Sequence, residues 1–134
     1  MNSKKNWISV GFLVVAIIIG YVFTMITVDG ESMNPTLENR EKVFVNSRAF
    51  MFGEAEIGDI VVANYNGEII VKRVVGVPGN TIVFTKDNVF TRNGVEDPKI
   101  VLPNVDDNPS GVYEKTKLKE GEYYLLGDNI EVSS

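Results

Sequence analysis

Among the serines and lysines of this sequence, Ser32 and Lys72 stand in segments that could position them for nucleophilic chemistry. A serine hydroxyl becomes a useful nucleophile when a neighbouring base takes its proton, and a lysine can be that base when its amine is neutral. The chain contains no His and no Cys. A Ser–His–Asp triad, a thiol nucleophile and a zinc site built from His or Cys are therefore excluded. A general base must be Lys, Asp, Glu or Tyr.

Ser32 lies in a segment whose composition suits a tight, exposed loop. Gly30 allows the backbone to approach a ligand closely, and Pro35 fixes its own φ and favours extended geometry at the residue before it. A serine in a loop of this kind is more often structural than catalytic, so both interpretations stay open on this segment alone. The segment Gly127-Asp128-Asn129, with Ser133 nearby, is by itself typical of a turn.

Lys72 stands in a run of residues that is typical of a β-strand. Residues two apart on a strand point to the same face, so Lys72 would lie between Ile70 and Val74, and Arg73 would face the other way. Burial disfavours the charged amine and lowers its pKa, by about 3–5 units for a fully buried group. The alternative is that Lys72 extends into solvent from an edge strand.

An uncharged apolar segment extends from Trp7 to Val28. About 20 apolar residues are enough to cross a bilayer as a helix. Lys4 and Lys5 precede the segment and acidic residues follow it, so the positive-inside rule places the N-terminus in the cytoplasm. A cleaved secretory signal peptide is the alternative, but the apolar run is longer than usual for one and no Ala-x-Ala-like site follows it.

These observations predict one membrane-anchored chain with three parts. We expect a cytoplasmic N-terminus at residues 1–6, a single-pass transmembrane anchor at residues 7–28 and an extracytoplasmic β-rich catalytic domain at residues 29–134. The expected location is the cell membrane.

The remainder of the chain is typical of an antiparallel β domain. Asn66-Gly67 separates two β-rich runs, and an Asn-Gly step there indicates a hairpin because both central residues take positive φ. Asn93-Gly94 marks another tight turn. We expect strands at residues 42–45, 59–64, 68–75, 81–85, 88–92 and 122–126, and a long irregular segment at residues 96–121. The apolar cluster Phe50-Met51-Phe52 is expected in the core, with insertion into lipid as the alternative.

Four segments, taken in order, resemble the motifs of bacterial type I signal peptidases (peptidase family S26). They are Gly30–Leu37, Gly58–Val62, Lys72–Gly79 and Gly127–Asn129. The resemblance covers essentially the whole chain, and the short spacing between the segments is similar to the Gram-positive type. It implies a mainly β fold, with an antiparallel β-sheet or barrel-like catalytic domain behind one N-terminal transmembrane helix.

The resemblance also implies an activity and a mechanism. The protein would be a membrane-bound serine endopeptidase that removes N-terminal signal peptides from secreted precursors. Ser32 would attack the carbonyl at the cleavage site and form an acyl-enzyme, and Lys72 would be the general base. The expected subsites next to the cut would take small side chains.

Further residues would support this site. The backbone N–H of Ser32 would stabilise the oxyanion, with Gly30 and Met33 beside it. Some members of the family have a Ser where this chain has Gly30, so the second oxyanion donor is left open. Ser133 would orient the lysine, and Asp128 would support the site without touching the reacting atoms.

The expected partners follow from the same resemblance. They are membrane lipid and preproteins that carry signal peptides. Contact with the secretion translocon is compatible with this placement. No cofactor and no metal are expected. Binding to nucleic acid is not expected, because the net charge is −5 and no basic stretch is present. A self-cleaving Ser–Lys repressor is disfavoured too, because the apolar segment stands where its DNA-binding domain would be.

The sequence departs from the family pattern near its end. The family motif continues after the serine that Ser133 matches with Asp-Ser-Arg, whereas this sequence stops at Ser134. We therefore expect a C-terminally truncated member of the family, without the Asp and Arg that would help to hold the lysine in position. The alternative function is a non-catalytic, membrane-anchored binding or assembly module.

Overall fold

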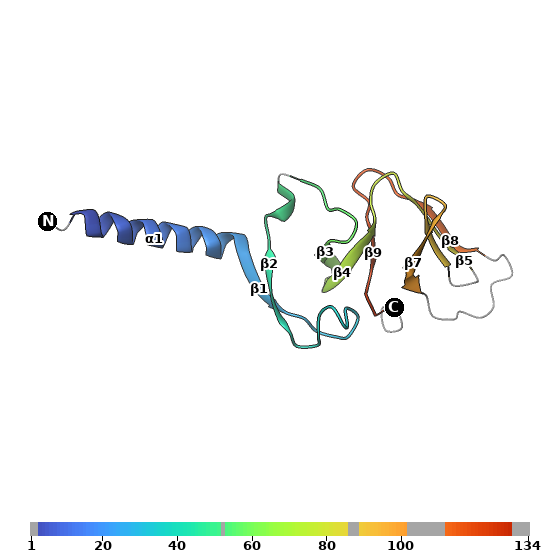
Figure 1. Ribbon diagram of the computed structural model, residues 1–134, viewed down its shortest axis with the longest axis horizontal. Helices are drawn as coiled ribbons and strands as arrows, with labels where there is room; N and C mark the ends of the chain where they lie inside the picture. Colours follow the sequence, from blue (N-terminus) through green and yellow to red (C-terminus); the bar gives the residue numbers. More distant parts are fainter. Residues whose placement is uncertain (1–2, 52, 86–88, 102–111, 130–134) are drawn as a thin grey trace.

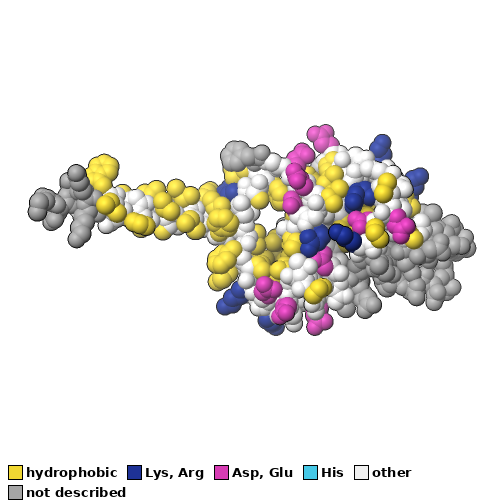
Figure 2. All heavy atoms as spheres, viewed as in Figure 1, with side chains coloured by type: hydrophobic (Ala, Val, Ile, Leu, Met, Phe, Trp, Pro, Cys, Tyr) yellow, Lys and Arg dark blue, Asp and Glu magenta, His cyan; other side chains and the backbone are white. Residues whose placement is uncertain are grey.

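The structure is a computed structural model that describes residues 3–51, 53–85, 89–101 and 112–129. Helix α1 (Ser3–Val22) projects as a rod from the β-rich remainder of the molecule (Figure 1). Hydrophobic side chains lie along this rod (Figure 2), and every side chain at positions 6–21 is exposed. Within the described ranges, no helix combines the length and the hydropathy that crossing a membrane requires.

The apolar N-terminal segment changes from helix to strand before it ends. Helix α1 ends at Val22 and strand β1 (Phe23–Thr27) follows directly, whereas the expected anchor continued to Val28. β1 pairs antiparallel with β2 (Lys42–Asn46). Aromatic and β-branched side chains such as those of β1 fit a pleated strand, and the ladder to β2 satisfies its backbone groups. The loop that joins the two strands carries Ser32.

A three-stranded antiparallel sheet carries Lys72. Its strands, in spatial order, are β3 (Ile60–Tyr65), β4 (Glu68–Gly76) and β9 (Tyr124–Leu126). The expected hairpin turn joins β3 to β4, with φ of 52° at Asn66 and 92° at Gly67. β9 pairs with β4 only over Arg73–Gly76. The preceding half of that edge of β4 therefore has no partner among the described strands.

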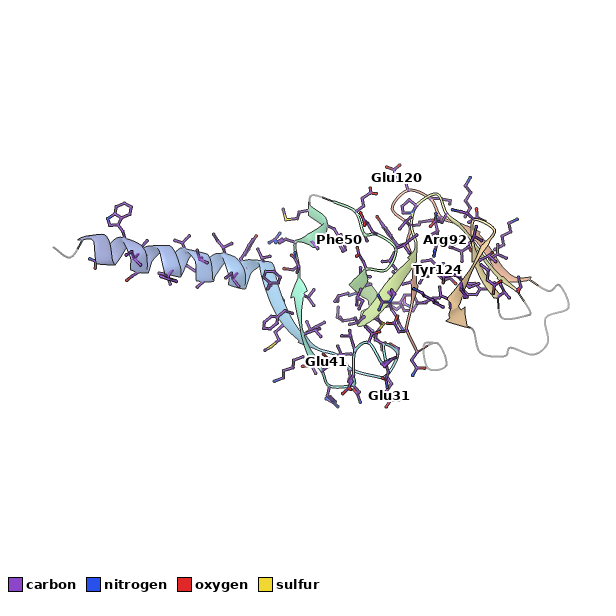
Figure 3. The ribbon with its side chains drawn as sticks, in the orientation of Figure 1. Glu31, Glu41, Phe50, Arg92, Glu120 and Tyr124 are labelled. Carbon is purple, nitrogen blue, oxygen red and sulfur yellow. The ribbon has the colours of Figure 1, made fainter. Side chains whose placement is uncertain are left out.

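A four-stranded antiparallel sheet holds most of the core. Its strands, in spatial order, are β7 (Val95–Val101), β6 (Val89–Arg92), β5 (Thr81–Thr85) and β8 (Val112–Lys117). The main cluster of buried side chains consists of Val75, Ile82, Phe84, Phe90 and Leu118. The ring of Tyr124 lies 5.6 Å from that of Phe84, centroid to centroid, and so connects the two larger sheets. Tyr124 and Arg92 are both labelled in this region in Figure 3.

The close approach of the two sheets explains one glycine. A Cβ at Gly76 would lie 2.9 Å from the Cδ1 atoms of Ile82 and Leu118. Real Cβ contacts are longer than this, so β4 passes over the core at Gly76 only because the residue has no side chain.

The mainly antiparallel β architecture behind one N-terminal helix is confirmed, and the expected strands are found with ends shifted by no more than two residues. Two expectations about the strands are wrong. β8 and all of β7 except Val95 lie inside the segment 96–121 that was expected to be irregular, because these strands pair with β5 and β6. Pro98 fits there since β7 is an edge strand, where a missing N–H need not break a ladder. The described strands also form three open sheets instead of the expected barrel-like sheet.

The apolar cluster that was expected in the core lies at the surface instead. The 3-10 helix η1 (Ala49–Met51) contains two of its members, and Phe50 and Met51 are 52% and 57% exposed. The side chain of Phe50 is labelled beside this turn in Figure 3. Phe52 lies outside the described residues. The core interpretation is therefore wrong for the two residues that can be examined.

Candidate active site

The loop between β1 and β2 folds back on itself and presents Ser32. The backbone N–H of Arg40 donates to the carbonyl of Val28 at 2.8 Å, which closes the loop. Met33 is 1% exposed and anchors the loop from within. Gly30 has φ of 99°, a left-handed conformation that glycine adopts without strain. Ser32 itself is half-buried beside the buried methionine.

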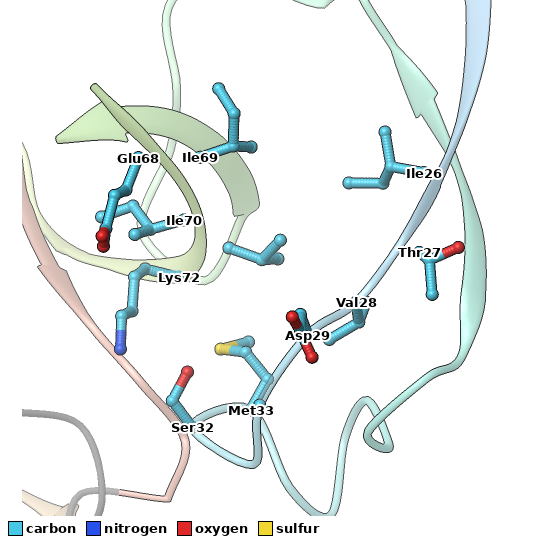
Figure 4. Close-up of a pocket in the computed structure, with 12 residues that line it drawn as sticks. Ile26, Thr27, Val28, Asp29, Ser32, Met33, Glu68, Ile69, Ile70 and Lys72 are labelled. Atoms are coloured by element: carbon cyan, nitrogen blue, oxygen red, sulfur yellow. The ribbon is translucent and has the colours of Figure 1, made fainter.

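Lys72 reaches the same place from β4. It lies opposite Val61 of β3 and is half-buried. Desolvation by burial lowers the pKa of its amine from the usual 10.5, because a less polar environment disfavours the ammonium form. Figure 4 shows the amine of Lys72 and the hydroxyl of Ser32 pointing toward one another. The alternative in which Lys72 extends away into solvent is therefore not the arrangement found.

Both side chains line a cavity of about 660 Å³ between β1 and β4 (Figure 4). The other lining residues are Ile26, Thr27, Val28, Asp29, Gly30, Met33, Glu68, Ile69, Ile70 and Val71. Alternate side chains of a strand point to opposite faces, so a cavity on one face is lined by every second residue. When consecutive residues line a cavity, the cavity lies along the edge of the strand. The cavity thus lies between two strand edges, that of β1 away from β2 and that of β4 before Arg73, and neither edge is paired with a described strand.

The turn after β9 is fastened to the loop that presents the serine. The backbone N–H of Asn129 donates to the carbonyl oxygen of Ser32 at 2.9 Å. The hydroxyl of Thr36, in the same loop, donates to a carboxylate oxygen of Asp128. Two hydrogen bonds therefore hold this turn against the loop that carries the hydroxyl.

Asp128 also binds the residue that follows the lysine. Its two carboxylate oxygens accept from Nε and Nη2 of Arg73 at 2.8 and 2.7 Å. Nη1 of Arg73 donates to the carbonyl of Gly58 at 2.6 Å. The hydrogen bond from Arg73 is the main cause that lowers the pKa of the Asp128 carboxyl, and burial opposes it. The same hydrogen bond raises the pKa of the guanidinium. A charge-assisted network thus joins β4, the turn after β9 and the Ser32 loop.

The supporting residues expected from the sequence fall in different places. Gly30 and Met33 line the cavity together with the two catalytic candidates, whereas Asp128 lines a separate cavity of about 450 Å³. Ser133 lies outside the described residues. In the part of the chain that the structure describes, no group of three acidic side chains is placed to hold a metal ion.

Sequence reasoning missed Arg73 and Thr36 as members of the network. One signal was available for the arginine. Because Arg73 follows Lys72 on a strand, it must point to the opposite face, and a half-buried guanidinium there requires an acidic partner. Nothing in the sequence separates Thr36 from any other loop threonine.

The comparisons with known proteins agree with the motifs. A family model described as signal peptidase, peptidase S26, matches residues 4–134. Signal peptidase I S of Bacillus subtilis (strain 168) is 33% identical, over 96% of this chain and 77% of that protein. Signal peptidase IB of Staphylococcus aureus (strain Mu50 / ATCC 700699) is 34% identical, over 94% of this chain and 74% of that protein. The chain therefore belongs to the signal peptidase family, peptidase S26.

Proposed function

We propose that this protein removes N-terminal signal peptides from secreted precursors as a serine endopeptidase, with Ser32 as the nucleophile and Lys72 as the general base. The observation that carries the proposal is the pair of side chains that face each other in the cavity between β1 and β4. The lowered pKa of the lysine supports the role of a base, because only the neutral amine can accept a proton. The names of the relatives, all signal peptidases, support the substrate class.

The reaction has two halves that use the same pair. In the first, the neutral amine of Lys72 takes the hydroxyl proton of Ser32 while Oγ bonds to the carbonyl carbon of the substrate. The backbone N–H of Ser32 stabilises the oxyanion, and the ammonium returns the proton to the amine that leaves when the C–N bond breaks. In the second, Lys72 takes a proton from water, the water oxygen attacks the acyl ester, and the proton returns to Oγ.

The substrate would lie as an extended strand in the cavity. Two strand edges that have no partner among the described strands border it. An extended peptide can hydrogen-bond to such edges while alternate side chains enter pockets. Near the reacting pair the walls include Met33 and Ile70, which favours small apolar side chains next to the cut.

We also propose that helix α1 anchors the protein in the cell membrane, with the N-terminus in the cytoplasm and the β-rich part, which begins at β1, outside. The exposed apolar side chains of α1 and the lysines that precede them in the sequence support this. A precursor held in the same bilayer would meet the enzyme at a raised effective concentration. Extraction of membranes with alkaline carbonate tests the anchor. The protein should stay in the pellet, and its release into the supernatant would refute the anchor.

The activity is tested with purified full-length protein in detergent and a fluorogenic peptide that contains a signal-peptide cleavage site. Ser32→Ala and Lys72→Met should each reduce turnover by at least a hundredfold, because general-base assistance alone contributes about 10²–10⁴-fold. Lys115→Met is the matched control, since Lys115 is exposed on β8 and away from the cavity. It should keep the wild-type rate. Peptide binding without any turnover by the wild type would favour the non-catalytic binding module instead.

A further inference from the structure

The junction between α1 and the β-rich part is held at two points. The chain passes from Val22 of α1 into β1 without a linker, which gives one covalent connection. The second point comes from the residues just after β2. Both the backbone N–H and the hydroxyl of Ser47 donate to the carbonyl of Val22, each at 2.9 Å. The carbonyls of the last helical turn lack partners within the helix, so these bonds cap its end.

Arg48 strengthens the same junction. Its guanidinium carbon lies 4.3 Å from the centroid of the Tyr21 ring, in the last turn of α1. Nη1 also donates to the sulfur of Met51, at 3.7 Å. A cation over an aromatic ring is attracted by the ring face, and a cation near a helix C-terminus is favoured by the helix dipole. Arg48 is half-buried, although the helix side chains at positions 6–21 are exposed.

The strands connect this junction to the proposed catalytic loop. β1 and β2 are paired along their whole length, from Phe23 opposite Asn46 to Thr27 opposite Lys42. Five residues of strand span about 17 Å. The loop with Ser32 stands at the far end of this two-stranded arm, where Figure 3 labels Glu31 and Glu41. A change in the direction of α1 at one end of the arm therefore moves the serine at the other.

We propose that Ser47 and Arg48 form a clamp on the last turn of α1 that fixes the direction of the helix relative to the loop carrying Ser32. The inference rests on the proposed function, because its consequence concerns precursors held in a membrane by their own apolar segments. With the clamp in place, the reacting pair is held at a fixed height and orientation above the bilayer. A short soluble peptide, which can approach from any direction, does not depend on the clamp.

The first measurement concerns geometry and needs no activity. Because the chain has no Cys, Asn6→Cys and Lys115→Cys provide two unique positions for spin labels, one on α1 and one on β8. In vesicles the distance distribution should be narrow for the otherwise unchanged protein. It should be at least twice as wide with Arg48→Gln and close to the original with Arg48→Lys, which keeps a cation over the ring. Lys42→Gln, an exposed cation on the same arm, is the matched control and should leave the width unchanged. Equal widths in all variants would overturn the clamp.

The second measurement concerns substrates, with full-length protein in vesicles. For Arg48→Gln we expect cleavage of a co-reconstituted precursor to fall at least fivefold, while kcat/KM for a soluble peptide stays within twofold of wild type. Arg48→Lys should restore at least half of the precursor rate. An equal loss on both substrates, or no loss on the precursor, would overturn the inference. If the unchanged protein cleaves neither substrate, the proposed function fails, and the distance measurement still tests the clamp.

Discussion

Replacing Asp128 with alanine should destabilise the fold by removing the centre of the network behind the site. The carboxylate accepts two hydrogen bonds from Arg73 and one from Thr36. Removing one partner of a fully buried ion pair costs about 3–5 kcal/mol. Here the side chains of Arg73 and Asp128 keep 30% and 17% exposure, so water reaches the unpaired guanidinium and reduces this cost. We expect the free energy of unfolding to fall by about 2–3 kcal/mol.

Denaturant unfolding followed by circular dichroism measures this change. Asp97→Ala is the matched control, because Asp97 has similar exposure but makes only one 3.5 Å contact with Arg92 and accepts one hydrogen bond, at 3.2 Å, from the backbone N–H of Lys99. The Asp97→Ala substitution should lower the free energy of unfolding by less than about 1 kcal/mol. Turnover of Asp128→Ala should also fall, since Thr36 and the Ser32 loop lose a point of attachment. If Asp128→Ala proves no more destabilising than Asp97→Ala, the network does not brace the site.

The same carboxylate predicts a dependence of stability on pH. Its folded pKa is lowered below the ordinary 3.8, first by the hydrogen bond from Arg73. A group with a lowered folded pKa contributes stability that is complete above its unfolded pKa and is lost as the pH falls through its folded pKa. The difference in unfolding free energy between wild type and Asp128→Ala should therefore narrow as the pH is lowered below about 3.8. A difference that widens on acidification would contradict the pairing.

Further outcomes concern the lysine and the core. In the proposed mechanism Lys72 acts as the neutral amine, and burial lowers its pKa. The value of kcat/KM should therefore rise with pH along a limb whose midpoint lies below 10.5, and a midpoint at or above 10.5 would refute the desolvation. Gly76→Ala should lower the free energy of unfolding by about 1–3 kcal/mol, because the new Cβ would crowd Ile82 and Leu118. Gly53→Ala, which has no atom within 4 Å of its added Cβ, should be nearly neutral when both variants are unfolded in urea, and equal effects would contradict the packing argument.

The parts of the fold that local chemistry determines could be predicted from the sequence. Asn66-Gly67 and Asn93-Gly94 form the expected turns, with φ between 52° and 92°, because Asn and Gly tolerate the left-handed conformation that such turns require. The position of Lys72 on a strand also followed from alternation. These features depend on a few neighbouring residues, so a short segment is enough to specify them.

Features that depend on distant partners could not be predicted. Phe23–Thr27 is as apolar as the helix before it, and only its pairing with β2 decides that it is a strand. Val95–Val101 contains a proline and charged residues, yet it is a strand because an edge of the four-stranded sheet was open to it. The network of Asp128 and Arg73 joins one strand, the turn after β9 and two loops that are distant in the sequence, which no local pattern specifies.

The most direct test of the central claim is to trap the acyl-enzyme. Full-length protein is mixed with a precursor, quenched in acid within the first turnover, digested and analysed by mass spectrometry. Attack by Ser32 predicts that the peptide containing Ser32 carries the acyl portion of the substrate as an ester. The adduct should be absent in Ser32→Ala and strongly reduced in Lys72→Met, but retained in Lys115→Met. Turnover by Ser32→Ala at the wild-type rate, or an adduct on a different residue, would contradict the assignment of the nucleophile.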